Sequence, residues 1–181
     1  MFYLHPHKFK TNTISATQLL ISYKSGQRNF GQVNLARTAL IDENLTGVEL
    51  WRSNLTEVNL SRSILDLANL SEADLSGSNL WRTHLYSANL VESKLSRALL
   101  IRACLEEANL SRASLINADM RLVYLKKADL RNADLSEADL SYADLRSANL
   151  RGANLDGTIF TGANMAQADL RDTNLDKAVI E

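Results

Sequence analysis

Leucine recurs at every fifth residue through most of the chain. Between Asp129 and Leu155 the sequence reads DLRNADLSEADLSYADLRSANLRGANL, with no slippage in the register. The residue two places before each leucine in this stretch is alanine, and the residue directly before it is Asp or Asn. This repeat constrains the fold more than any other feature of the sequence.

A period of five fits neither of the ordinary secondary structures. On an α-helix five residues turn by roughly 500°, so successive leucines would lie ~140° apart and form no stripe. On a flat strand an odd period places successive leucines on opposite faces. The chain is therefore expected to bend after every five residues, so that each leucine points to a common axis and successive coils satisfy each other's backbone groups.

The repeat predicts which side chains point inward. The leucine and the small residue two places before it face the axis, and the other three positions face outward. The Asp or Asn before each leucine has a short side chain that can bond nearby backbone at the bend. The apolar position runs without insertion from Phe30 to Ile180, and it is leucine everywhere except at Phe30, Met120, Phe160, Met165 and Ile180.

One residue breaks the inward pattern. The small position is Ala, Ser, Thr or Val from Val33 to Ala178, except at Glu43. A lone charge facing the axis is costly. We therefore expect Glu43 to pair with a basic group such as Lys24 or Arg28, or to reach water at a distorted corner.

The segments LSEADLSGSNL and LRNADLSEADLSYADLRSANLRGANL resemble the pentapeptide repeat family, whose loose consensus is A(D/N)LXX. The resemblance covers about five-sixths of the chain. It implies a right-handed quadrilateral β-helix with four pentapeptides per coil, in a family most abundant in cyanobacteria whose members mostly have no assigned function. At four repeats per coil the rod has about 7.5 coils and is ~36 Å long. We therefore expect one all-β solenoid of 7–8 coils over residues 30–181.

Residues 1–29 are expected to form a tail and a capping helix. Ser15 and Gln18 have the spacing of a capping box, and Gly26 is a suitable stop, so the pattern predicts a short helix over Ala16–Lys24. A solenoid needs a cover over the open end of its core, and members of the family often begin with a similar helix. Residues Met1–Thr13 show no period and are expected to form a partly ordered tail.

Composition excludes several function classes. The net charge is −1, so no global field attracts nucleic acid or mimics it. Cys104 is the one cysteine, which excludes an internal disulfide and suits a reducing compartment. The N-terminus lacks the apolar run of a signal peptide, and no segment is long enough to span a membrane. These features predict a cytoplasmic protein.

No catalytic or cofactor-binding set emerges from the sequence. His5 and His7 lie in the tail without a third ligand, so no metal site is predicted. Cys104 and His84 differ by twenty residues and would be neighbours in adjacent coils. An activated thiol is one interpretation of this pair, and an ordinary solvated surface pair is the one we favour. The protein is expected not to be an enzyme.

The outward positions that break the consensus converge when the chain is wound at four repeats per coil. Apolar, aromatic and arginine side chains then gather on one ridge in the middle of the rod, and this composition is typical of protein interfaces. The alternative is ordinary surface, since single exposed apolar residues need no explanation. The predicted ridge consists of Arg62, Trp81, Arg82, His84, Tyr86, Ile101, Arg102, Leu122 and Tyr124.

The sequence therefore predicts a non-enzymatic scaffold or regulator that binds another protein, whose identity it does not reveal. The alternative is a DNA mimic that protects or inhibits a type II topoisomerase, as in the quinolone-resistance branch of the family. Near-zero net charge and the use of leucine at the central position count against that reading. Leu170, Leu175 and Ile180 end the repeat with no helix after them, which predicts end-to-end dimers or a cover made by the last few residues.

Overall fold

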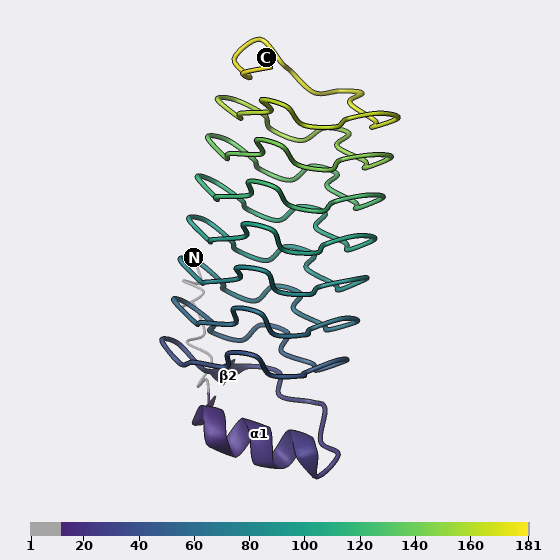
Figure 1. The fold of residues 1–181 in the computed structure, drawn as a ribbon. Helices are drawn as coiled ribbons and strands as arrows, with labels where there is room; N and C mark the ends of the chain where they lie inside the picture. Colours follow the sequence, from purple (N-terminus) through teal and green to yellow (C-terminus); the bar gives the residue numbers. More distant parts are fainter. Residues whose placement is uncertain (1–11, 181) are drawn as a thin grey trace, which may run out of the picture.

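The computed structural model describes residues 12–180, which form a rod of stacked coils with a helix lying across the N-terminal end (Figure 1). The elements are β1 (Asn12–Thr13), α1 (Ala16–Lys24) and β2 (Val33–Asn34). β1 and β2 pair in parallel, so Asn12 and Thr13, which were assigned to the predicted tail, form a strand. His5 and His7 lie outside the described residues.

The coils are joined by a ladder of parallel bridges between residues twenty apart. The bridges run from Asn29↔Glu49 to Ile159↔Val179. At most corners the amide of the apolar residue donates to a carbonyl nineteen residues ahead, as in Leu110 N to Asp129 O at 2.7 Å. A coil of twenty residues holds four repeats of five, which confirms the four-sided winding expected from the resemblance.

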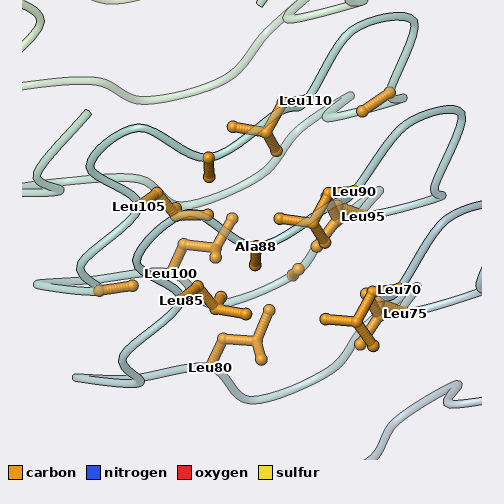
Figure 2. Packing of buried hydrophobic residues seen from close by; sticks show 14 of the residues in the cluster. Leu70, Leu75, Leu80, Leu85, Ala88, Leu90, Leu95, Leu100, Leu105 and Leu110 are labelled. Atoms are coloured by element: carbon orange, nitrogen blue, oxygen red, sulfur yellow. The ribbon is translucent and has the colours of Figure 1, made fainter. Parts of the chain in front are cut away.

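The core is a column of leucine and alanine side chains inside the coils. Leu110 and Leu115 are fully buried, and so are the small residues Ala108 and Ala128 on the same axis. Figure 2 shows leucines of successive coils stacked inside the tube. The inward assignment of the leucine and of the small residue is therefore confirmed.

Each corner is a tight turn that begins at the leucine. At one of them Thr38 N donates to Leu35 O at 3.2 Å, and Asn34 Oδ1 accepts from Ala36 N at 3.1 Å. The second bond confirms the predicted role of Asp and Asn at the bends. The third residue of this turn, Arg37, has φ +59°, a left-handed conformation that is costly for a residue with a side chain. The same holds at most corners, where the inter-coil ladder on both sides fixes the backbone.

α1 has the bounds and the N-terminal capping box expected from the sequence. Ser15 N donates to Gln18 Oε1 at 2.8 Å, and Gln18 N donates to Ser15 Oγ at 3.1 Å. Leu19 is fully buried and belongs to the same core cluster as the leucines of the coils. The Tyr23 hydroxyl donates to Thr46 O at 2.8 Å, which joins the helix to the first coil.

Glu43 does not make the ion pair that was one of its two expected outcomes. Within residues 12–180 it has no basic partner, and the residue is half-buried. Arg28 is occupied elsewhere, because its guanidinium lies 3.9 Å from the ring centroid of Tyr23 and donates to Tyr23 O.

The core is less completely covered in the last described coil. Leu170 and Leu175 are half-buried, and Ile180 is 49% exposed. Val179 returns to the preceding coil, where Phe160 N donates to Val179 O at 2.7 Å. Dimerisation through this part of the rod stays a prediction.

The Ser and Thr hydroxyl groups at the inward small position donate hydrogen bonds to backbone carbonyls, with one exception. Thr83 Oγ1 donates to Leu60 O, and Ser93 Oγ donates to Leu90 O, both at 2.8 Å. Ser78 is also fully buried, yet its hydroxyl has no hydrogen-bond partner among the described residues. A buried hydroxyl without a partner destabilises the folded state.

Replacing Leu110 with Arg is expected to cost several kcal/mol of unfolding free energy, because it places a charge in the middle of the core. Thermal unfolding followed by circular dichroism measures the effect. Asn117→Arg is the matched control, since Asn117 is exposed. A Leu110→Arg variant that melts within a degree or two of the wild type would contradict the inward assignment.

Ser78→Ala is expected to stabilise the protein by about 1 kcal/mol, because it removes a buried hydroxyl that lacks a partner. Ser93→Ala at the equivalent inward position should destabilise it by about 1 kcal/mol, because it removes a hydroxyl that is bonded. Denaturant unfolding of both variants tests the pair. Equal shifts in the same direction would show that the Ser78 hydroxyl is satisfied in solution.

Candidate partner-binding ridge

The winding brings the predicted ridge residues into neighbouring columns that run along the rod. Residues twenty apart occupy the same place on adjacent coils, as the bridges His84↔Cys104 and Cys104↔Tyr124 show. Arg82 N donates to Ile101 O at 3.0 Å, which places the Arg82 corner directly beside the Ile101 corner.

Four of the predicted residues line one surface hollow. This first hollow has a volume of about 350 Å³, and its lining consists of Arg82, His84, Arg102, Cys104, Glu106 and Tyr124. Cys104 and Glu106 are additions to the predicted set. Tyr124 is 47% exposed, so the hollow has an aromatic edge open to solvent.

A second hollow of about 440 Å³ lies at the next coils, lined by Ile101, Arg121, Leu122, Ser141 and Tyr142. Tyr142 is 64% exposed and was missed by the sequence analysis. The signal was present, because Tyr142 lies twenty residues after Leu122 and breaks a run of consensus repeats. A side chain at Gly162 would begin 2.7 Å from the Tyr142 ring, so glycine leaves room for that ring on the following coil.

The three arginines of the predicted ridge differ in whether a carboxylate neutralises their charge. Arg62 pairs with Asp42, with Nε and Oδ1 2.6 Å apart, and this bond lowers the pKa of the Asp42 carboxyl. Arg82 lies over the ring of its neighbour Trp81, 5.4 Å from the centroid, in a cation–π contact. Arg102 and Arg82 have no carboxylate partner within residues 12–180.

Most other arginines of the rod are neutralised by a carboxylate. The pairs join adjacent coils or bridge a single corner. The paired arginines are Arg37, Arg52, Arg62, Arg112, Arg121, Arg131, Arg146, Arg151 and Arg171. Against this pattern, two adjacent arginines without partners are a distinctive feature of the first hollow.

Tyr86 belongs to neither hollow. Its hydroxyl donates to Glu107 Oε2 at 2.8 Å, and Lys127 lies 3.2 Å from the other oxygen of that carboxylate. These bonds, led by the one from Tyr86, lower the pKa of Glu107. Tyr86 therefore extends the ridge sideways and supports an ion pair.

Cys104 and His84 are neighbours, as the twenty-residue spacing predicted. Burial raises the pKa of the Cys104 thiol, and the charges of Glu106 and Asp66 add to that effect against a hydrogen bond from the backbone that lowers it. A raised pKa reduces the thiolate fraction at neutral pH. The partial burial of Cys104 and the raised pKa of its thiol favour an ordinary surface pair over an activated nucleophile.

Across residues 12–180, no group of three or more His, Cys, Asp or Glu side chains is arranged to hold a metal ion. No helix in that part of the chain combines the length and the apolar character of a membrane-spanning segment.

Comparison with known proteins gives a consistent assignment of the fold. The model of pentapeptide repeats matches in eight copies, over residues 29–62, 63–101, 103–141 and 138–178. The crystal structure of HetL, a pentapeptide repeat protein involved in heterocyst differentiation regulation from the cyanobacterium Nostoc sp. strain PCC 7120, is 30% identical; the match covers 92% of this chain and 97% of HetL, with a TM-score of 0.42.

Two further solved structures are similar. The pentapeptide repeat protein Rfr23 from the cyanobacterium Cyanothece 51142 is 24% identical, with 92% of this chain and 100% of Rfr23 covered and a TM-score of 0.35. A trypsin-treated form of QnrB1, a plasmid-mediated fluoroquinolone resistance protein, is 16% identical, with 78% of this chain and 76% of that one covered and a TM-score of 0.64. Among curated proteins, no sequence matches significantly.

The Cys104 thiol is expected to react slowly with a disulfide reagent at neutral pH, because its pKa is raised. The pH dependence of the rate should have its midpoint above ~8.5, the value of an ordinary thiol. His84→Ala should leave the rate within about twofold, since an imidazole that does not activate the thiol has no role in the attack. A midpoint below neutrality, lost in the His84 variant, would contradict this description.

Proposed function

The chain belongs to the pentapeptide repeat family, whose members fold as right-handed quadrilateral β-helices, and from this premise we propose that it is a non-enzymatic scaffold that binds another protein through the ridge. The observation that carries the proposal is the convergence of the consensus-breaking residues at one corner of the rod. Six of the nine ridge residues line two neighbouring hollows, with exposed Tyr124 and Leu122 at their edges.

The chemistry of the ridge supports protein binding. Aromatic and arginine side chains dominate the energetics of protein interfaces. Trp81 and Tyr124 supply the aromatic surface, and Arg82 and Arg102 supply donors that no described carboxylate engages. None of these side chains is needed for the inter-coil ladder, which uses backbone atoms alone.

We further infer that α1 is the N-terminal cap of a rod of 7–8 coils. Burial of Leu19 in the core cluster and the bond from Tyr23 to Thr46 support this role. A covered end keeps the core of the first coil out of water. The rod thereby presents its sides as the surface for binding.

A topoisomerase-protecting DNA mimic is the weaker alternative. A mimic has to reproduce the dense negative charge of the duplex, whereas this chain carries a net charge of −1. The likeness to QnrB1 at 16% identity concerns the fold alone. We propose that the protein acts in the cytoplasm, without a cofactor and without direct binding of nucleic acid.

The double variant Trp81→Ala with Tyr124→Ala is expected to keep its melting temperature within a few degrees and to lose bound partner proteins. Truncating a central aromatic residue of an interface typically costs ~2 kcal/mol or more. The measurement is quantitative recovery of proteins from a lysate of the cells that express this chain, together with thermal unfolding of the purified variant.

Val91→Ala with Lys94→Ala is the matched control. Val91 lies ten residues after Trp81, which is half a coil, so the control pair occupies the opposite corner of the rod. The control should retain every partner. If the ridge variant also retains every partner, the ridge is ordinary surface; if it unfolds, its aromatic side chains belong to the packing of the fold.

A further inference from the structure

We propose that the occupant of the ridge is an extended peptide segment that places an acidic side chain against Arg82 and Arg102 and an apolar side chain against Leu122 and Tyr142. This inference rests on the proposed function and adds the chemistry of the partner. These four residues lie at successive twenty-residue steps and form one column along the rod, here called the recognition column.

The four residues of the recognition column share one backbone conformation, and their side chains change from cationic to apolar along it. Its members have φ values of +55°, +57°, +58° and +60°, in the order Arg82, Arg102, Leu122, Tyr142, so their side chains leave the corner in nearly the same direction. All four are exposed. The column is cationic at one end and apolar at the other.

The cationic end lacks a counter-charge. Arg82 and Arg102 lie on adjacent coils, about 4.8 Å apart in backbone, and their like charges repel. Glu106 lines the same hollow but forms no ion pair with either of them among the described residues. An added carboxylate would relieve the repulsion and accept charge-assisted hydrogen bonds from the two guanidinium groups.

The chain contains its own example of this recognition. Asp42 and Arg62 occupy the same column on the two preceding coils, and there the guanidinium donates to the carboxylate from both Nε and Nη2. The carboxylate of a bound peptide would meet Arg82 and Arg102 in the same way. The contact between Arg62 and Asp42 within the protein would thus be repeated, on the next two coils, between the peptide carboxylate and the two arginines.

The apolar end is suited to a hydrophobic side chain. Leu122 is 38% exposed and Tyr142 64% exposed, and Ile101 contributes to the same hollow. Arg121 at the rim is already held by Asp119, with Nε and Oδ1 2.8 Å apart, so its charge does not compete for the peptide acid. The Tyr142 ring lies against Gly162 on the following coil, where a Cβ would be 2.7 Å from the ring, so the position of the ring depends on that glycine.

The spacing of the two ends selects an extended conformation. The midpoint of the arginine pair and the midpoint of the Leu122–Tyr142 pair are two coils apart, about 9.6 Å. A polyproline II segment advances ~9.3 Å in three residues and returns to the same face. In a β-strand, the residue three positions along points to the opposite face. On a helix, the residue that returns to the same face lies seven positions along, at ~10.5 Å, which matches the separation of the two ends less well than the polyproline II advance. The expected motif therefore has an acidic and an apolar residue three positions apart.

The test uses fluorescence polarisation with a labelled polyproline peptide that carries one glutamate and, three residues later, one phenylalanine. Saturable binding to the wild-type protein is expected, weakening as salt is added. Replacing the glutamate with glutamine, or reducing the spacing to two residues, should each raise Kd about tenfold or more. A helical peptide with a seven-residue spacing should bind no better than these controls.

Protein variants locate the site. Arg82→Gln with Arg102→Gln should raise Kd about tenfold, and Tyr142→Ala should raise it severalfold. Arg97→Glu is the control with the same change in net charge, since Arg97 is exposed on a different corner and has no described carboxylate partner. It should leave Kd within about twofold.

The outcomes separate this inference from the proposed function. No saturable peptide binding by the wild type, stronger binding of the helical peptide, or equal effects of the Arg82/Arg102 and Arg97 variants would overturn the acidic extended occupant. If the Trp81/Tyr124 variant nevertheless loses its partners, the ridge binds a protein of other chemistry. If that variant retains them, the proposed function itself fails.

Discussion

The hydrogen-bond ladder between residues twenty apart is the constraint on which the rest of the structure depends. Each coil has neither a helix nor a wide sheet to satisfy its backbone, so its amides and carbonyls bond to the coils on either side. The ladder holds the coils at the inter-strand distance and makes the interior narrow. A leucine at each corner fills that interior when a small residue accompanies it, and for this reason Ala108 and Ala128 are as fully buried as Leu110.

The same ladder accounts for an unusual backbone. Residues with full side chains, such as Arg37 and Leu67, hold a left-handed φ of +59° and +60° at their corners. Glycine would suit these positions, yet it appears at few of them. Hydrogen bonds to the neighbouring coils fix the backbone at these corners. They offset the conformational free energy that the left-handed φ costs. The result is a column of side chains at each corner of the rod, all leaving the backbone in the same direction and all available for function.

The proposed binding function depends on the sequence of one such corner column. Along most columns, arginines and carboxylates neutralise each other locally, as with Arg52 and Glu72 at 2.8 Å. These exposed pairs add little to stability, but they leave a surface without strong local charge. The ridge departs from that pattern because Arg82 and Arg102 follow each other without an intervening acid, and because leucine and tyrosine succeed them. We propose that a partner recognises this corner by both its charge and its shape.

The sequence by itself determined the inward register, the bounds of α1 with its capping box, and the corner role of Asp and Asn. Each of these depends on residues within a few positions of one another or on a strict period. Four repeats per coil came through resemblance, since the five-residue spacing does not count the sides. The tertiary structure alone decided how outward side chains meet across coils. It paired Arg62 with Asp42, turned Tyr86 toward Glu107 and added Tyr142 to the second hollow. Of the two outcomes expected for Glu43, it gave no ion pair among the described residues. These contacts join residues about twenty positions apart through flexible side chains, and a linear pattern specifies their columns but not their directions.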